Sequence, residues 1–400
     1  MTRTTRRWRT TRRVGSVVAL FVLLGSPSAQ ASSEQGGSDH ASRAASDSHA
    51  ALSLTGSITA AGSTWVTLDM GKSDAQHDLF WQLFTFHSAG TEWVLVTPPG
   101  VADNGGLVVT SGPKSNSALA GFGPSQALTF SPLAITTTGG AHWGPGGLPT
   151  ALVTVPSSLA LGSGSRALAL VGGSSQKVLS TAGALTAWRP LVTLSRFATT
   201  SSGRRCDVVA LRAVALSAQD EPLLGASCRK PGFAGIFAYA DGEWNAVPTA
   251  LPRSLEEHTF DVLRLTPSSA LLAADEHGTT SLIASWQGTA GRPWAVSPAL
   301  PLAAGTHLLA SGSGPGNTWF VVVADNGQAR AEVNSGPGSS WQTLSSLPAA
   351  TASIAFEPDG RIDAFVVNDA HLSIWRLSTE TSTWTKVQSL VVPIAFGSSA

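Results

Sequence analysis

The sequence has little charge and few reactive side chains. Only 12% of its 400 residues are charged, and it contains two cysteines and one tyrosine. No Cys/His spacing suits zinc, and no loop of regularly spaced aspartates suits calcium, so no metal or other cofactor is expected. No Gly-x-Ser-x-Gly segment stands at a strand-to-helix turn, and Gly162-Ser163-Gly164-Ser165 is interpreted as a turn next to a strand. These absences leave no catalytic constellation.

The first 31 residues are predicted to be a cleaved export signal. Six arginines precede an apolar run, Val14 to Leu24, and Ala29-Gln30-Ala31 follows as a small-x-small cleavage site. The apolar run is much shorter than the ~20 residues that a membrane-spanning helix needs. Thr11-Arg12-Arg13 keeps twin-arginine export open beside the general secretory route. We therefore expect no membrane span, a mature chain that begins at Ser32, and a secreted protein, extracellular or associated with the cell wall.

Removal of that signal makes the chain acidic. The signal holds six arginines and no acidic residue, which leaves 19 basic and 25 acidic residues and a formal charge of −6. Nucleic-acid binding needs a basic patch or stripe, so no nucleic-acid partner is expected. Residues 32–51 have no hydrophobic periodicity and are predicted to be a disordered leader. Residues 52–400 are glycine- and proline-rich, which is typical of short strands joined by turns.

A tryptophan recurs along the chain at intervals of roughly 45 to 55 residues, with several strand-length apolar runs between one and the next. This is the spacing of a four-stranded propeller blade. We therefore predict an all-β fold, a seven-bladed β-propeller of four-stranded antiparallel blades that occupies residues 52–400. One tryptophan per blade at a fixed strand position is interpreted as core between sheets rather than as a sugar-stacking platform. The recurring residues are Trp93, Trp143, Trp188, Trp244, Trp294, Trp341 and Trp384.

The predicted blades must close into a ring. The segment Pro393-Ile394-Ala395-Phe396-Gly397 is similar to the inner strand Ser353-Ile354-Ala355-Phe356. We expect it to complete the first blade, with Leu52 to Ile58 as the competing segment. A β-sandwich array and a ring of six or eight blades are the alternative folds. The predicted blades span about 52–99, 106–148, 157–193, 207–251, 260–300, 307–347 and 353–392.

The turns before two of these tryptophans resemble the Asp-box repeats of sialidase-like (BNR) propellers, whose pattern is Ser-x-Asp-x-Gly-x-Thr-Trp. The segment from Asn334 to Trp341 keeps the glycine, a hydroxyl residue and the tryptophan, but Gly336 replaces the aspartate. Thr289-Ala290-Gly291-Arg292-Pro293-Trp294 keeps the glycine and the tryptophan. Catalysis in that family needs a tyrosine nucleophile, whereas Tyr239 is predicted inside the third strand of the fourth blade. The resemblance implies a degenerate, non-catalytic member.

The two cysteines are predicted to form a disulfide. An exported chain meets an oxidising compartment, which favours pairing of Cys206 with Cys228. Cys206 is expected to begin the inner strand of the fourth blade, and Cys228 to end its second strand. A hairpin around Asp220 would bring these strand ends opposite each other.

Charged residues gather on the loops of the fourth and fifth predicted blades. The loops before an inner strand and after a second strand share one face of a propeller, where the central channel is expected to open. Blade four brings basic residues there and blade five brings acidic residues, with Asp207 and Asp261 at matched strand starts. A solvated rim with surface ion pairs is the competing interpretation. The tentative ligand-binding set is Arg204, Arg205, Asp207, Arg229, Lys230, Glu256, Glu257, His258, Asp261, Asp275, Glu276 and His277.

Fold does not determine function. The leading hypothesis is a non-catalytic extracellular binding module, expected to be monomeric, that takes a glycan or a protein at this channel mouth. The alternative is a secreted carbohydrate-active hydrolase or lyase that uses rim carboxylates such as Glu256, Glu257, Asp261 and Asp275, because a pair of carboxylates is the minimum for that chemistry. No catalytic residue is assigned.

Overall fold

A computed structural model describes residues 56–393, apart from 72–78, 100–105, 123–132, 146–155, 164–165, 174, 183–184, 186, 289–291 and 326. The chain divides into two units, Met1–Asp47 and Ser48–Ala400, and every described residue belongs to the second. The predicted signal, the predicted leader and most of the predicted closing segment 393–397 lie outside the described residues. No helix within the described residues is long and apolar enough to cross a membrane.

The described chain is mostly β-strand, as its composition predicts, and its strands follow one another in antiparallel groups of four. The first group is β1 (Gly56–Ala60), β2 (Ser63–Gly71), β3 (Leu79–His87) and β4 (Val94–Leu95). The second is β5 (Leu107–Ser111), β6 (Ala118–Phe122), β7 (Leu133–Thr136) and β8 (Gly144–Pro145). The third is β9 (Pro156–Leu161), β10 (Ala167–Val171), β11 (Lys177–Thr181) and β12 (Arg189–Thr193).

The later groups repeat the pattern. The fourth is β13 (Val208–Leu216), β14 (Pro222–Cys228), β15 (Ile236–Ala240) and β16 (Glu243–Ala246). The fifth is β17 (Thr259–Leu265), β18 (Ser269–Glu276), β19 (Thr279–Trp286) and β20 (Ala295–Val296), with β21 (Leu300–Pro301) also paired to β19. The sixth is β22 (His307–Ser313), β23 (Trp319–Asp325), β24 (Gln328–Asn334) and β25 (Gln342–Thr343). The last is β26 (Thr351–Phe356), β27 (Ile362–Asn368), β28 (His371–Leu377) and β29 (Trp384–Val391).

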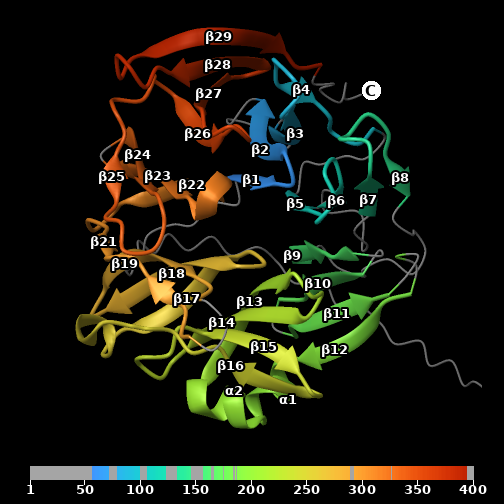
Figure 1. The fold of residues 1–400 in the computed structure, drawn as a ribbon, viewed down its shortest axis with the longest axis vertical. Coiled ribbons are helices and arrows are strands. Elements are labelled where there is room, and N and C mark those ends of the chain that lie inside the picture. The colour runs from blue at the N-terminus through green and yellow to red at the C-terminus, as the bar shows by residue number, and fades with distance from the viewer. Residues whose placement is uncertain are drawn as a thin grey trace, which may run out of the picture. The chain divides into compact units, whose positions relative to one another are not determined.

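Hydrophobic clusters lie between consecutive groups. Each junction has its own cluster, and one cluster joins the last group to the first through Phe365 and Phe84. Figure 1 shows the groups side by side around a common centre, with the first strand of most groups facing it. Four-stranded sheets that pack face to face around a centre form a β-propeller.

The recurring tryptophans occupy these junctions. Each of the seven belongs to a different cluster and packs against the group that precedes its own in the chain or, for Trp93, against the last group. The indole of Trp143, in the second group, also donates a 2.8 Å hydrogen bond to the carbonyl of Val96, which directly follows the last strand of the first group. Their predicted role as core between sheets is confirmed.

The inner strands close in a way that the sequence analysis got wrong. The inner position of the first group, predicted for the segment 393–397, is held by β1, which overlaps the competing segment Leu52 to Ile58 at residues 56–58 and pairs with β2 along its whole length. On its other edge β1 pairs in parallel with β22 through Gly56–Ser311, Ser57–Gly312 and Ile58–Ser313. We call this pairing the seam. The inner strand of the last group, β26, packs behind the seam against both β1 and β22.

Two short helices stand where the sequence analysis expected a loop and a strand start. They are α1 (Leu194–Ala198) and α2 (Ser201–Cys206). Hydroxyl caps begin both: the side chain of Thr193 accepts the Arg196 N–H at 3.1 Å and that of Thr200 accepts the Gly203 N–H at 3.0 Å. Phe197 of α1 is fully buried against Phe237 and Trp244 of the fourth sheet. The inner strand of that sheet therefore starts at residue 208 rather than at Cys206.

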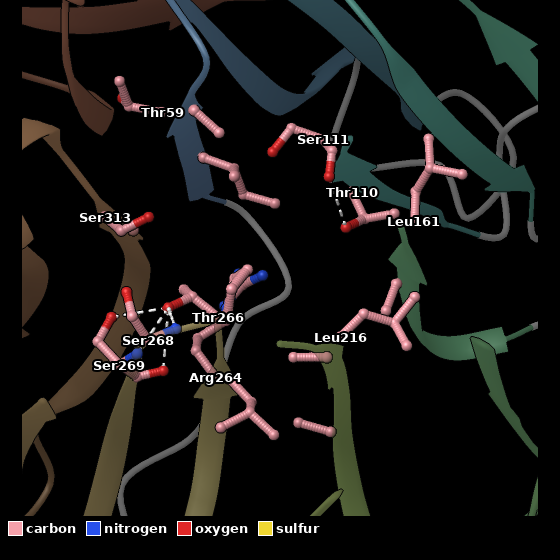
Figure 2. Close-up of a pocket in the computed structure, with 18 of the residues that line it drawn as sticks. Thr59, Thr110, Ser111, Leu161, Leu216, Arg264, Thr266, Ser268, Ser269 and Ser313 are labelled. Atoms are coloured by element: carbon pink, nitrogen blue, oxygen red, sulfur yellow. Dashed lines mark hydrogen bonds between the residues drawn. The ribbon is translucent and has the colours of Figure 1, made fainter. Parts of the chain in front are cut away.

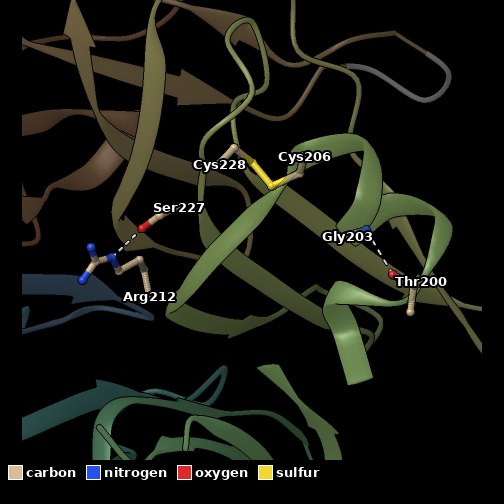
Figure 3. Close-up of a disulfide and its surroundings, with 6 residues drawn as sticks. All are labelled: Thr200, Gly203, Cys206, Arg212, Ser227 and Cys228. Atoms are coloured by element: carbon tan, nitrogen blue, oxygen red, sulfur yellow. Dashed lines mark hydrogen bonds between the residues drawn. A yellow bond between two sulfur atoms is a disulfide. The ribbon is translucent and has the colours of Figure 1, made fainter. Parts of the chain in front are cut away.

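The predicted disulfide is confirmed (Figure 3). Cys206, the last residue of α2, is bonded to Cys228, the last residue of β14, with 5.0 Å between their Cα atoms. The register that brings them together is the predicted one, since Val208 pairs with Cys228 and the turn between the strands contains Asp220. Both cysteines are buried.

Candidate functional site

A cavity of about 760 Å³ lies at the centre of the inner strands. Residues of six of these strands line it: β1, β5, β9, β13, β17 and β22. Among the described residues, the last group contributes only Pro358, from the turn after β26, because the seam stands between β26 and the cavity. The lining includes the turns that join each inner strand to the second strand of its group, which places the cavity toward that face of the sheets.

Hydroxyl groups dominate the polar lining of this cavity (Figure 2). They come from the inner strands and from their turns, so they surround the cavity rather than cluster on one wall. In the turn after β17 the Thr266 side chain accepts the Ser269 N–H at 2.9 Å, which fixes the turn against the cavity. Figure 2 shows Thr59, Thr110, Ser111, Thr266, Ser268, Ser269 and Ser313 among the lining residues.

Arg264 of β17 carries a positive charge into the cavity. Its Nε donates a hydrogen bond to the Ser311 hydroxyl on β22 at 3.3 Å. Burial by the surrounding protein lowers the pKa of Arg264, although the side chain keeps partial exposure to the cavity. An arginine remains charged even so, because its ordinary pKa lies far above neutral. The guanidinium is therefore a partly desolvated cation inside a hydroxyl-lined space.

The seam leaves room for this guanidinium only because residue 56 is glycine. A Cβ atom on Gly56 would lie 2.0 Å from the Ser311 carbonyl oxygen and 2.9 Å from the terminal Nη2 of Arg264. Both distances are shorter than real Cβ contacts. Gly56 therefore permits the parallel approach of β1 to β22 and the seat of the guanidinium beside it.

A second arginine lines the cavity from β13. Arg212 donates to the Ser227 hydroxyl through Nε at 2.7 Å and forms an ion pair with Asp261 of β17 through Nη2 at 3.2 Å. Both side chains of the ion pair are partly exposed. Asp220, an acidic residue of the turn after β13, accepts the Ser163 N–H of the turn after β9 at 2.9 Å and also bonds to the Ser163 hydroxyl.

The predicted ligand-binding residues lie largely outside this cavity. Of the twelve, Asp261 alone is among its described lining residues. The others lie toward the opposite ends of the same strands, where β13 and β17 begin and β14 and β18 end. Asp207 and Asp261 do not occupy matched positions: Asp207 caps α2 in the left-handed conformation, whereas Asp261 is the third residue of β17.

The basic half of the predicted set is organised around α2. Arg204 and Arg205 lie in the last turn of this helix. Arg229 forms an exposed ion pair with Asp207 at 3.3 Å. Arg205 and Lys230 both approach the ring of Phe233, within 5.8 and 5.5 Å of its centre. The surface carries positive charge over an aromatic ring.

The acidic half adjoins the basic one. Nε2 of His258 lies 3.4 Å from a carboxylate oxygen of Glu276, and Nδ1 of His277 lies 3.9 Å from the other oxygen of the same carboxylate. The Gly232 N–H, two residues beyond Lys230, donates to the His258 carbonyl at 3.0 Å, so the two predicted clusters share one surface. Glu256 and Glu257 are exposed, and Asp275 lies next to the last residue of β18. A ligand-binding role for this surface stays a prediction.

Sequence reasoning missed a buried ionic cluster at the junction of the last group with the first. Glu357 and Asp363 are fully buried. The Glu357 carboxyl group contacts the guanidinium of Arg376 and lies 2.5 Å from Nη2 of Arg361. The Asp363 carboxylate accepts hydrogen bonds from Nε of Arg376 at 3.0 Å and from the Trp93 indole at 2.7 Å. Burial, then a hydrogen bond with Asp363, raises the pKa of Glu357 to about 8.

The sequence around this cluster holds a partial signal. Asp359-Gly360-Arg361 predicts a hairpin turn, and such a turn joins β26 to β27. Asp363 directly precedes the apolar run Ala364-Phe365-Val366, which is a position where charge is unusual. Recognising it as buried would have required knowing that Trp93 reaches across from another sheet. Within the described part of the chain, no group of three or more His, Cys, Asp or Glu residues is placed to hold a metal ion.

Comparisons with known proteins place this chain in no family. No protein-family model and no curated protein matches the sequence. Among solved structures, the chain is similar to the six-bladed β-propeller lectin of Aleuria aurantia, at 11% identity over 86% of this chain and 96% of the lectin, with a TM-score of 0.40.

Two other solved structures show a similar likeness. YCF48 from Cyanidioschyzon merolae is 15% identical over 76% of this chain and 88% of its own, with a TM-score of 0.42. A puromycin-hydrolyzing peptidase of Mycobacterium tuberculosis is 11% identical over 88% of this chain and 56% of its own, with a TM-score of 0.45. At these identities and TM-scores the likeness carries no functional assignment.

Proposed function

We propose that this protein is a secreted binding module, a seven-bladed β-propeller that takes a glycan or a protein ligand without transforming it. The blade number is supported by the seven consecutive four-stranded groups of the described residues and by the cluster that packs the last group on the first. Export is supported by the arginine-rich leader with its apolar run and by the Cys206–Cys228 disulfide, which an oxidising compartment favours.

The central cavity is the observation that carries the binding proposal. A volume of about 760 Å³ lies within the range of small-molecule binding sites. Its hydroxyl lining, with Arg264 inside, offers hydrogen bonds to a polar ligand from several directions. We therefore place the binding site at the cavity rather than at the charged surface around α2, which the sequence favoured.

A ligand screen with a blocked cavity tests this proposal. The mature chain is applied to a glycan array and a peptide array, together with a Ser313→Trp variant, because Ser313 lines the cavity at the end of β22. Lys386→Trp is the matched control, since Lys386 lies on the exposed outer strand β29. Binding by the wild type and the control that is lost in Ser313→Trp supports the cavity. Binding that survives in the wild type, Ser313→Trp and Lys386→Trp contradicts the cavity as the binding site. A further variant, Arg229→Glu, tests the charged surface around α2: if it alone loses binding, the site lies on that surface.

A further inference from the structure

The outer strand of the last group is longer than the other outer strands. β29 has eight residues, whereas the described outer strands of the other six groups have two to five. Within the described residues it pairs with β28 alone, and Figure 1 shows it on the outside of its group. Five of its eight residues are exposed. At a rise of about 3.4 Å per residue, its outer edge offers about 27 Å of backbone to another strand.

Exposed apolar side chains gather beside this edge. Four large apolar residues of the described chain are exposed, and three of them lie here: Val387 and Val391 on β29, and Val94 on β4 of the first group. The side-chain amide of Gln388 joins the two strands, because its Nε2 donates to the Trp93 carbonyl at 2.8 Å and its Oε1 accepts the Trp93 N–H at 2.9 Å. Val387 and Val94 are the chain neighbours of the two residues that this contact joins, so the apolar residues of both strands occupy one part of the rim.

The edge has little of the protection that sheet edges usually have. Edge strands are normally kept short, or carry charged residues, prolines or bulges that prevent pairing with another chain. β29 contains one charged residue, Lys386, and no proline. A bulge lies at Val387: the register passes from Trp375–Lys386 to Ile374–Gln388 and leaves Val387 without a residue opposite it on β28. These two adjacent features restrict the register of a partner strand and leave both ends of β29 open.

We propose that β29 is an interface through which two copies of this chain pair edge to edge and antiparallel, so that two four-stranded sheets form one continuous sheet. The contact does not involve the central cavity, whose described lining contains no residue of β29. One surface supplies both halves of the interface, as a two-fold symmetric dimer requires. Each copy brings a strand that is already folded, so pairing costs less conformational entropy than the ordering of a flexible peptide would. Like charges repel only in registers that set Lys386 opposite itself.

Sedimentation equilibrium of the mature chain tests the pairing. We expect a monomer–dimer equilibrium with a micromolar dissociation constant, because strand addition forms a small interface of the transient class. Val387→Glu should weaken the dimer about 10-fold or more, since Val387 lies near the middle of the strand and two like charges would meet there. Val209→Glu is the matched control: Val209 is 41% exposed against 45% for Val387, and it too has no residue opposite it on the neighbouring strand. Equal weakening by both variants overturns the proposal.

A charge swap tests whether the partner is a second copy. Val387→Glu and Val387→Lys should each remain monomeric, and an equimolar mixture should recover the dimer, because opposite charges then meet across the two-fold axis. If both variants melt as the wild type does and their mixture stays monomeric, the pairing is refuted. Hydrogen–deuterium exchange of the wild type needs no variant and locates the contact. Exchange at residues 384–391 should slow as concentration rises through the dissociation constant, and protection elsewhere instead contradicts the interface.

Two other outcomes would assign the contact differently. Association that salt abolishes and that Val387→Glu leaves unchanged would place it on the charged surface around α2, since the proposed interface contains no ion pair. A chain that stays monomeric into the sub-millimolar range overturns the second copy as the partner. Phage-displayed peptides captured by that monomer, and lost in Val387→Glu, would then assign the edge to an extended segment of another protein.

Discussion

Replacing both cysteines with serine should lower the stability of the propeller by a measurable and calculable amount. The disulfide joins Cys206 to Cys228, 22 positions apart, and closes a loop that contains the β13–β14 hairpin. In the chain-entropy treatment, closing a loop of this length lowers the conformational entropy of the unfolded state, which raises its free energy by about 3 kcal/mol. Removing the bond returns that freedom to the unfolded chain, so the free energy of unfolding falls by a similar amount.

The expected change in melting temperature follows from the size of the domain. Unfolding entropy of about 2 cal/mol/K per residue gives roughly 0.7 kcal/mol/K for a domain of about 350 residues, so about 3 kcal/mol corresponds to a loss of about 4 °C. Differential scanning calorimetry of the wild type and the Cys206→Ser/Cys228→Ser variant measures it. Wild type incubated with a phosphine reductant should melt with the variant. A difference below 1 °C would refute the loop-entropy reasoning, and two thiols alkylated in unreduced, denatured wild type would refute the bond itself.

Four further predictions concern the core, the ionic cluster, the seam and export. Trp93→Phe should cost about 1–3 kcal/mol in urea unfolding because buried Asp363 loses the indole donor at 2.7 Å, whereas Trp143→Phe, whose indole is partly exposed, should cost less; equal losses would contradict this. The native pKa of Glu357, about 8, lies above its ordinary 4.5, so the native state holds a proton that the unfolded chain releases. Stability from this group is complete below pH 4.5 and declines as pH rises through 8; Glu357→Gln should flatten that decline, and an unchanged slope would disprove the assignment. Gly56→Ala should lower the free energy of unfolding by about 1–3 kcal/mol, since its Cβ would lie 2.0 Å from the Ser311 carbonyl oxygen. A variant that melts at the wild-type temperature would show that the pairing of β1 with β22 adjusts to a side chain without cost. N-terminal sequencing of the secreted chain should begin at Ser32, and any residue upstream of Ala31 in the mature protein would exclude the predicted cleavage site.

The parts of the structure that the sequence predicts are those with a local, repeated signal. Trp294 and Trp341 each stand directly before a short outer strand, at the same place in their groups, and their spacing reveals the repeat. The pairing of Cys206 with Cys228 follows because a hairpin brings the ends of its two strands together whatever surrounds it. Such features need only neighbouring residues to be correct.

The helices and the site carry weaker signals. A helix of five or six residues is too short to display a 3.6-residue period, and Phe197 is the single apolar anchor of α1. The position of the cavity depends on how six inner strands are arranged around the centre. That arrangement is a property of all six strands together, so the sequence of any one strand does not reveal it. The predicted site was chosen for its clustered charges, which lie near Arg229 and Glu276. The cavity is instead lined by hydroxyls, and these occur throughout the chain and so do not mark a site in the sequence.

The seam also sets the order in which the molecule can be completed. Gly56 to Ile58 pair with Ser311 to Ser313, so the inner edge of the first sheet has to wait for a partner more than 250 residues downstream. A chain that emerges from its amino end can fold several sheets in sequence, each on the one before, while that first edge stays bare. Long-range strand pairing of this kind is slow and exposes the unpaired strand to other chains. Nascent or truncated forms that end before β22 are therefore the species most prone to associate with one another, and export in an unfolded state would postpone that exposure until the whole chain is available.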